Sequence, residues 1–352
     1  MRLAAIGSIG FFSWMLAANA QLKELSDPRE KHLANVRQIT HGGNNAEAYW
    51  SFDGRKIIFQ SDTGSNKADQ IYIMDADGRN VRMVSTGKGR CTCAYFLPAG
   101  NEIIFSSTHA FSPDVPPVPD RSQGYVWPIY PYYVIYRANA DGSKLRPLFP
   151  KKVGPGVLTA YNAESTIAPN GQRIIFTSTT DGDLDLYSMK IDGTDVRRLT
   201  NTLGYDGGAY YSPDSKMIVW RAFHPESEAD KQEYRDLLKR NLVKPTRMEI
   251  WVANADGSAA RQVTQNGKAN FAPFFTPDGK HIIFASNMDD PKGRQFELYL
   301  IGIDGTGLER VTFGGQFDAF PMFSPNGKRL VWASNRHGKE HETNIFVADW
   351  IP

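Results

Sequence analysis

Short apolar runs separated by turn residues recur along the chain and predict β-strands rather than helices. In residues 51–59, Ser-Phe-Asp-Gly-Arg-Lys-Ile-Ile-Phe, a polar turn leads into a β-branched run that ends in an aromatic residue. Asp or Asn in such a turn bonds back to the backbone, Pro presets φ at the first corner, and Gly accepts a positive φ. The Ile-Ile-Phe run is too short for a helix, and its continuous apolarity predicts burial on both faces. The pattern occurs six times, at residues 51–59, 97–105, 168–176, 212–220, 276–284 and 324–332.

Each copy continues with a second apolar strand, an Asp-Gly turn and a closing Arg-x-Val/Leu-Thr strand. Asp-Gly between alternating strands is a strong hairpin signal. Four strands repeated at about 45 residues are typical of a propeller blade. We therefore predict an all-β, six-bladed β-propeller of four-stranded blades over residues 36–352.

The two ends of the repeat predict how the ring closes. The sixth copy stops after its third strand, residues 344–350, while residues 36–40, Val-Arg-Gln-Ile-Thr, resemble an unpaired fourth strand. We expect this N-terminal strand to complete the last blade, which would remove an exposed sheet edge.

The repeated Ser-Pro-Asp-Gly-Lys-x-Ile-x-Phe and Asn-Ala-Asp-Gly-x-x-x-Arg-x-Val/Leu-Thr motifs resemble the TolB-like β-propeller repeat over residues 36–350. TolB itself carries an α/β domain before its propeller. Here only a tail of residues 21–35 precedes the repeat, so the resemblance implies a TolB-related exported propeller that lacks this domain.

Residues 1–20 predict a secretory signal peptide. A positive start is followed by an apolar run and by Ala-Asn-Ala, a pattern that signal peptidase cleaves, here before Gln21. The run is shorter than the ~20 residues of a membrane span, and no later segment predicts one. We expect a periplasmic or secreted protein. Cys91 and Cys93 are the two cysteines, and a bridge over such a short spacing would be strained, so free thiols are expected.

Charge gives no indication of a nucleic-acid partner. The chain has 40 basic and 38 acidic residues, a net charge of +2, and no block of like charges. An electrostatic footprint for nucleic acid is therefore missing from the sequence.

Two insertions, about residues 110–131 and 225–246, fall between the second and third strands of blades 2 and 4. In a four-stranded blade these loops emerge on the same side as the blade-to-blade crossings. The first insert is rich in Pro and carries Trp127 among tyrosines, and the second has the apolar spacing of a short helix near residues 230–240. Long loops on one face of a rigid scaffold indicate a binding face. The alternative is that they only cover the propeller or form a dimer contact.

Residues that begin the innermost strands are expected to ring the channel mouth on that face. Counting back from each first turn selects two sets, Asn45, Cys91, Asn162, Asp206, Asn270 and Asp318, and Glu47, Cys93, Glu164, Gly208, Ala272 and Phe320. From these sets we predict ligand contacts for Glu47, Cys93, Glu164, Asp206, Asn270 and Asp318, with Arg221 and Trp127. For the first set, the alternative is capping of the crossing loops by Asn and Asp side chains.

Arg221 follows the aromatic residue of the second strand in blade 4, at a position where the other blades have small or neutral residues. It either pairs with a carboxylate, from Asp206 or Glu164, or holds a ligand carboxylate or phosphate. His109 and His224 follow second strands at the roots of the two inserts. With an acid from the same face, they are candidates for a divalent metal site.

The sequence lacks the motifs of common enzyme classes: it has no Gly-x-Ser-x-Gly, no phosphate loop and no His-Glu-x-x-His. We therefore expect a non-catalytic propeller that binds a protein, peptide or glycan partner on the insert-bearing face and needs no cofactor. The alternative is a polysaccharide lyase or hydrolase, similar to oligogalacturonate lyases, with a site and a divalent metal at the channel mouth.

Overall fold

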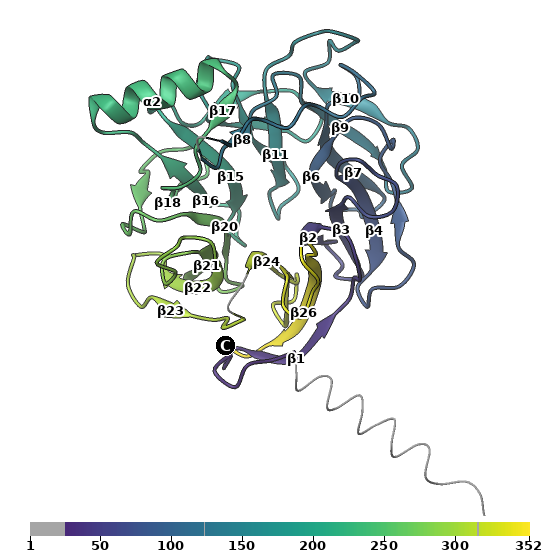
Figure 1. Ribbon diagram of the computed structural model, residues 1–352. Coiled ribbons are helices and arrows are strands. Elements are labelled where there is room, and N and C mark those ends of the chain that lie inside the picture. Colours follow the sequence, from purple (N-terminus) through teal and green to yellow (C-terminus); the bar gives the residue numbers. More distant parts are fainter. Residues whose placement is uncertain (1–24, 123, 315–316) are drawn as a thin grey trace, which may run out of the picture.

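A computed structural model of the chain describes residues 25–122, 124–314 and 317–352. Within these residues, six four-stranded antiparallel sheets are arranged as blades around one axis (Figure 1). The prediction of a six-bladed β-propeller is therefore confirmed. The predicted signal peptide, residues 1–20, lies outside the described residues.

The strands of the first three blades run outward from the axis in chain order. Blade 1 is β2 Asn45–Trp50, β3 Lys56–Ser61, β4 Gln70–Asp75 and β5 Arg82–Met83. Blade 2 is β6 Cys91–Phe96, β7 Glu102–Ser107, β9 Val134–Asn139 and β10 Arg146–Phe149. Blade 3 is β11 Asn162–Ile167, β12 Arg173–Ser178, β13 Asp185–Lys190 and β14 Arg197–Arg198.

The other three blades follow the same plan, with one exchange in the last. Blade 4 is β15 Tyr205–Tyr211, β16 Met217–Phe223, β18 Glu249–Asn254 and β19 Arg261–Gln262. Blade 5 is β20 Asn270–Phe275, β21 His281–Ser286, β22 Glu297–Gly302 and β23 Glu309–Arg310. Blade 6 is β24 Asp318–Phe323, β25 Arg329–Ser334, β26 Asn344–Trp350 and, outermost, β1 Leu33–Gln38.

The N-terminal strand closes the ring as predicted. Strand β1 pairs antiparallel with β26, with Leu33 opposite Trp350 and Gln38 opposite Phe346. In Figure 1 the first and last strands of the described chain lie side by side at the bottom of the ring. The strand begins at Leu33, inside the segment expected to be a tail, so the closing ladder is longer at this end than predicted.

The turn chemistry and the core also match the sequence pattern. In blade 1 the Ser51 hydroxyl donates to the Asp53 carboxylate over 2.6 Å, and the Arg55 amide donates to the same oxygen over 3.0 Å. Gly54 completes the turn at a φ of 68°. Ile57, Ile58 and Phe59 behind it are at most 2% exposed. Both faces of this run are therefore buried, as its continuous apolarity predicts.

Each innermost strand carries a β-bulge near its start. The register to the second strand shifts in all six blades. One residue of every bulge has a left-handed φ between 47° and 62°, namely Glu47, Cys93, Glu164, Gly208, Ala272 and Phe320. A bulge bends its strand and redirects one side chain. These six residues are the second set that we selected from the sequence.

Side chains two residues beyond the bulges close the central channel. The Tyr49 ring centroid lies 5.6 Å from that of Tyr95 and 5.9 Å from that of Tyr210. The Tyr210 ring in turn lies 5.2 Å from Phe274. Blades 1 and 4 are opposite one another in a six-bladed ring, so the contact between Tyr49 and Tyr210 crosses the axis. We name Tyr49, Tyr95, Tyr210 and Phe274 the aromatic plug.

The two inserts form the remaining elements. The blade 2 insert contains β8 Trp127–Pro128, and the blade 4 insert contains α2 Glu228–Lys239 and β17 Leu242–Val243. The predicted helix is thus present, and its residues Tyr234 and Leu237 are buried. Among the helices in the described part of the chain, none has the length and apolar character that crossing a membrane requires.

Candidate functional site

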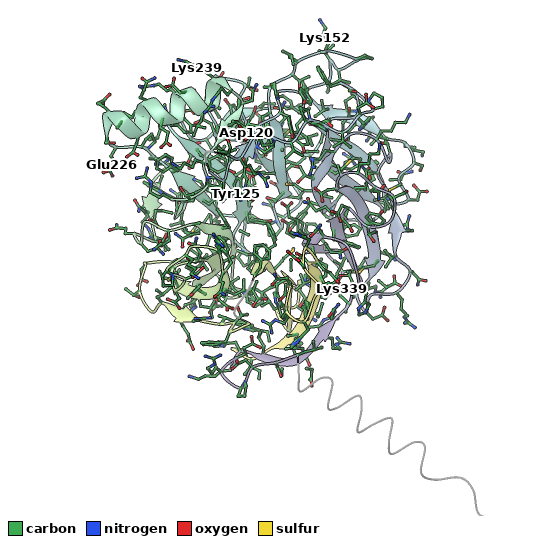
Figure 2. All side chains as sticks on the ribbon, in the orientation of Figure 1. Asp120, Tyr125, Lys152, Glu226, Lys239 and Lys339 are labelled. Atoms are coloured by element: carbon green, nitrogen blue, oxygen red, sulfur yellow. The ribbon has the colours of Figure 1, made fainter. Side chains whose placement is uncertain are left out.

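A cavity of about 1060 Å³ opens at the end of the ring where the innermost strands begin. Both inserts line it, together with the bulge residues Glu47, Glu164 and Phe320. In Figure 2, Tyr125 of the blade 2 insert lies toward the central opening, whereas Lys152 and Glu226 lie at the periphery. Ten aromatic side chains line the wall: Tyr125, Trp127, Tyr130, Tyr133, Tyr161, Tyr205, Phe271, Phe296, Phe317 and Phe320.

The two inserts hold one another across blade 3. Strands β8 and β17 pair antiparallel, with Trp127 opposite Val243, and the Ile129 amide donates to the Asn241 carbonyl over 2.7 Å. This pairing carries Trp127 from blade 2 to the side chains of blades 4 and 5. The Trp127 ring lies 5.1 Å from the Phe271 ring and 5.3 Å from the Arg221 guanidinium. The inserts therefore build the wall of the cavity jointly.

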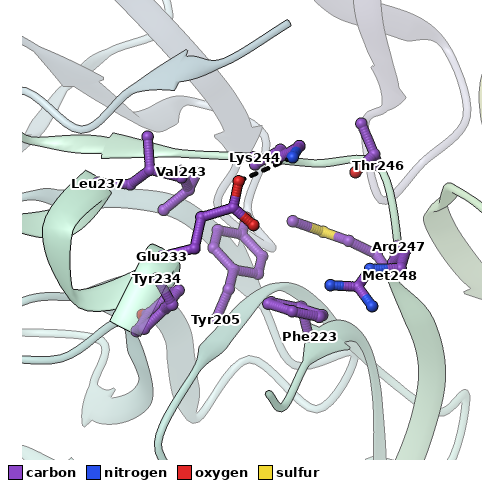
Figure 3. Close-up of a pocket in the computed structure, with 10 residues that line it drawn as sticks. All are labelled: Tyr205, Phe223, Glu233, Tyr234, Leu237, Val243, Lys244, Thr246, Arg247 and Met248. Carbon is purple, nitrogen blue, oxygen red and sulfur yellow. Dashed lines mark hydrogen bonds and ion pairs between the residues drawn. The ribbon is translucent and has the colours of Figure 1, made fainter. Parts of the chain in front are cut away.

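Helix α2 anchors this arrangement to blade 4. Ser227 caps the helix by accepting from the Asp230 amide, and the Tyr234 hydroxyl donates to the Gly204 carbonyl over 2.6 Å. Figure 3 shows the joint between helix and blade, where Glu233 and Lys244 form an ion pair of 2.8 Å. The space left at this joint is about 20 Å³. Because that is room for about one water molecule, the joint is a packing contact rather than a ligand site.

Arg221 and Glu164 form an ion pair at the base of the cavity. The Tyr205 hydroxyl accepts from Arg221 Nη2 over 2.7 Å and lies 3.0 Å from a Glu164 oxygen. Burial alone would lower the pKa of Arg221, but the Glu164 carboxylate together with Tyr205, Tyr161 and Glu47 outweighs burial, and the pKa is raised above its usual value. Of the two carboxylates predicted as partners for Arg221, the structure selects Glu164 of the neighbouring blade.

Two glycines of β15 make room for this ion pair. A Cβ atom on Gly208 would lie 1.9 Å from Arg221 Nη1, and one on Gly207 would lie 2.5 Å from a Glu164 carboxylate oxygen. The Gly208 amide also donates to that Glu164 oxygen over 2.9 Å. Blade 4 therefore has glycine at its bulge because the guanidinium occupies the space of a side chain.

Glu47 lies at the base of the same cavity, from blade 1. Its Oε2 atom is shielded from solvent and, among the described residues, has no hydrogen-bond partner. Burial raises the pKa of Glu47 to about 7, and the negative charge of Glu164 adds to the effect. Near neutral pH this carboxyl can therefore either accept or donate a hydrogen bond.

Replacing Glu47 with glutamine is expected to remove a pH dependence of stability. The folded protein keeps the Glu47 proton up to about pH 7, whereas the unfolded chain releases it near 4.5. The folded state therefore binds more protons in this window, and stability falls as the pH rises through it. In urea unfolding, the stability of Glu47→Gln relative to the wild type should rise by about 3 kcal/mol between pH 4 and pH 8. Glu226→Gln, at the exposed periphery, should show no such gain, and an equal gain in both variants would contradict the assignment.

Cys93 is buried beside this cluster and is not positioned to contact a ligand directly. Cys91 and Cys93 are both free and buried, as the spacing predicts. Burial raises the pKa of both thiols. The Cys93 amide donates to Gln60 Oε1 over 3.2 Å, and the Thr92 hydroxyl donates to the same atom over 2.9 Å. This network fixes the bulge of blade 2.

The predicted ligand residues Asp206, Asn270 and Asp318 do not line the cavity. All three are at most 1% exposed and bond within the protein. Asp206 Oδ1 accepts from Trp220 Nε1 over 2.6 Å, Asn270 Nδ2 donates to the Met248 carbonyl over 2.7 Å, and Asp318 Oδ1 accepts from Trp332 Nε1 over 3.1 Å. Asn270 therefore caps the crossing loop, as the alternative predicts. The two aspartates instead accept hydrogen bonds from tryptophans in the second strands of their own blades.

His109 and His224 are also engaged within the protein. His224 Nε2 lies 3.0 Å from Asp206 Oδ1, and His109 Nδ1 lies 2.8 Å from the Ser107 hydroxyl. Burial lowers the pKa of His109 to about 4. Across the described ranges, no three or more His, Cys, Asp or Glu side chains are placed to hold a metal ion. The donor set required by the predicted metal site is therefore not assembled.

Sequence reasoning missed much of the cavity lining. Phe271 is the second residue of β20 in blade 5, and Phe317 lies in the crossing just before β24. Lys292 and Arg294 come from the loop between the second and third strands of blade 5. That loop is of ordinary length and gave no signal of its own. Its position, equivalent to those of the two inserts, was the clue that could have identified it.

Comparisons with known proteins agree with this architecture. A family model described as the TolB beta propeller domain matches residues 236–349. The Tol-Pal system protein TolB of Francisella tularensis subsp. holarctica is 27% identical over 153 residues, which cover 36% of this chain and 35% of that protein. The first curated relatives are matched over only 25–35% of their own length.

Two solved structures show the same fold over most of the chain. A TolB candidate from Agrobacterium tumefaciens has a TM-score of 0.59 at 21% identity, covering 90% of this chain and 97% of that one. TolB from Acinetobacter baumannii has a TM-score of 0.55 at 18% identity, covering 87% of this chain and 64% of that one. At these identities the similarity concerns the fold.

Proposed function

Because this chain belongs to the TolB-like β-propeller family, we propose that it is a non-catalytic binding protein whose cavity holds a segment of a partner protein. The observation that carries the proposal is the blind, aromatic-lined cavity of about 1060 Å³. Ordinary ligand sites are concave, largely apolar and supplied with a few placed polar groups. Buried tryptophan and tyrosine are also the side chains that contribute most at protein interfaces.

The lining favours a peptide over a glycan. Apart from the five tyrosines, the uncharged polar side chains that line the cavity are Gln60, Thr92, Thr246 and Asn287. Gln60 accepts from Thr92 and from the Cys93 amide, and both ends of the Asn287 amide are occupied by backbone groups. A buried sugar needs many partners for its hydroxyls, and unpaired ones are costly. Apolar side chains of a peptide match this wall better.

The charged groups at the base support a binding role over a lyase or hydrolase. Glu164 is held by Arg221, Thr177, Tyr205 and the Gly208 amide. A general base needs a free lone pair within reach of its substrate proton. Glu47 has one, but the titratable groups beside it are the Glu164 carboxylate, which is already paired, and the Cys93 thiol, whose pKa burial raises so that it stays protonated. The alternative of a lyase or hydrolase is tested below, by whether the purified protein turns over a polysaccharide.

We also propose that the protein acts outside the cytoplasm. The support is the charged start, apolar run and Ala-Asn-Ala pattern of residues 1–20. N-terminal sequencing of the protein purified from its own cells should begin at Gln21. An intact Met1 on the purified protein would contradict export by this route.

A photo-crosslinking amino acid at position 125 tests the binding proposal. It should join a partner protein in extracts, because Tyr125 stands at the opening of the cavity and is 52% exposed. The same probe at position 152, on the periphery, should not join that partner.

Trp127→Ala should weaken this binding by at least tenfold, since an aromatic residue at the centre of an interface typically contributes 2 kcal/mol or more. Isothermal titration with the identified partner measures the change. Equal crosslinking at positions 125 and 152, or turnover of a polysaccharide by the purified protein, would overturn the proposal.

A further inference from the structure

The opening of the cavity carries unpaired positive charge. Arg121, Lys268, Lys292 and Arg294 all line it. Among the residues that the structure describes, no carboxylate forms an ion pair with any of these four side chains. Three of them, Arg121, Lys292 and Arg294, are exposed. We name these four residues the cationic rim.

The other charges of the cavity largely cancel. Arg90 pairs with Asp69 over 2.6 Å, and Arg221 pairs with Glu164. Six cationic and three acidic side chains line the cavity in total. Once the two pairs are set aside, the four rim cations face Glu47 alone, whose pKa of about 7 leaves it partly neutral. The whole chain carries a net charge of only +2, so positive charge is concentrated at this opening.

A concave, apolar-walled cavity strengthens the field of such charges. Low-dielectric walls focus the field lines into the opening and raise the local concentration of ions of the opposite sign. Arg121 additionally lies 4.9 Å from the ring of Tyr125, which keeps the guanidinium at the opening. Charged groups at the rim of an interface act mainly on partner choice and on the association rate.

We propose that the partner segment is acidic, with Asp or Glu side chains at the cationic rim and an apolar or aromatic side chain against Trp127 and Phe271. This inference rests on the proposed binding function and names the chemistry of its ligand. Carboxylates complement Arg and Lys at the rim, whereas the wall deeper in the cavity offers aromatic surface that suits an apolar or aromatic side chain. The carboxylates of an acidic glycan would pair with the cationic rim, but its hydroxyl groups would face a largely aromatic wall.

Selection from a random peptide display library against the mature full-length protein tests this inference. Enriched peptides should carry a net negative charge and at least one aromatic residue. Their affinity should fall at least tenfold between 50 and 300 mM salt, about what screening of several exposed charge pairs produces. Binding should also depend on Trp127.

A matched pair of charge reversals completes the design. Lys292→Glu with Arg294→Glu should weaken binding of the selected peptides by about tenfold or more, mainly through a slower association rate. Lys151→Glu with Lys152→Glu makes the same change in net charge on exposed residues away from the cavity, and should leave the affinity within about twofold.

The outcomes separate the two proposals. Trp127-dependent peptides that are neutral or basic and insensitive to salt would overturn the acidic segment while leaving the binding function intact. Absence of any Trp127-dependent peptide contradicts the binding function itself. If an acidic oligosaccharide binds more tightly than any selected peptide, the ligand is a glycan and the proposal of an acidic peptide segment is wrong.

Discussion

Gly208→Ala is expected to destabilise the protein by about 4–6 kcal/mol and to abolish partner binding. The added Cβ would lie 1.9 Å from Arg221 Nη1, so the guanidinium must leave its place beside Glu164. Separating a buried ion pair costs about 3–5 kcal/mol, since both charges lose their partner. The left-handed φ of 62° adds roughly 1 kcal/mol for a residue with a Cβ. Urea unfolding gives the stability, and titration with the partner gives the affinity.

Gly279→Ala is the matched control for this substitution. Gly279 has nearly the same backbone conformation, with a φ of 68°, but the nearest atom to an added Cβ is Pro213 Cδ at 3.8 Å. This variant should lose only about 1 kcal/mol, the cost of the left-handed conformation. If the two variants lose the same stability, the space occupied by Arg221 is not what requires glycine at position 208.

Arg336→Ala is expected to destabilise the closure of the ring by about 3–5 kcal/mol. Arg336 is 5% exposed and bridges Glu30, before the N-terminal strand, to Asp318, at the start of the innermost strand of blade 6. Its Nη2 atom lies 3.0 Å from Glu30 and 2.7 Å from Asp318. Removing the guanidinium leaves two buried carboxylates without a cation. The loss should appear as a lower midpoint in thermal and urea unfolding.

Hydrogen exchange distinguishes this mechanism from a general loss of stability. In Arg336→Ala, the amides of the N-terminal strand should exchange faster than those of blade 3, because the closing ladder opens first. Arg79→Ala, which removes an exposed ion pair with Asp77, should change the stability by less than about 1 kcal/mol. If amide exchange became faster by the same factor in all blades, Arg336 would not act locally on the N-terminal strand.

The fold could be predicted because its determinants are local and repeated. Six copies of one turn with its β-branched strand define the blades, and the missing fourth strand of the last copy, matched by residues 36–40, defines the closure. Each of these signals depends on a few neighbouring residues. Turn chemistry and burial of the Ile-Ile-Phe runs then follow from the residues themselves.

The bulges at the channel mouth could not be predicted from residue type. Glu47, Cys93 and Phe320 adopt left-handed φ values between 50° and 56°, although such residues rarely do so. The paired second strand imposes this conformation on them. Counting along the repeat found the right positions, but it could not show that a bulge redirects these side chains and leaves Asp206 and Asp318 in the core.

The cavity wall depends on contacts between distant segments, which a single sequence does not reveal. The ladder between β8 and β17 has strands of only two residues each, too short for any periodic signal. It nevertheless decides that Trp127 reaches Arg221 and Phe271. The choice between Glu164 and Asp206 as the partner of Arg221 was likewise open in the sequence, because it depends on how neighbouring blades face one another.

The aromatic plug sets what kind of segment the cavity can accept. Since Tyr49 and Tyr210 meet across the axis, no chain can be threaded from one side of the ring to the other. A bound segment must enter and leave through the same opening. The partner therefore has to insert a chain terminus or a tight turn rather than the middle of an extended strand. Two occupants cannot pass each other either, and a competitor must wait until the first has left.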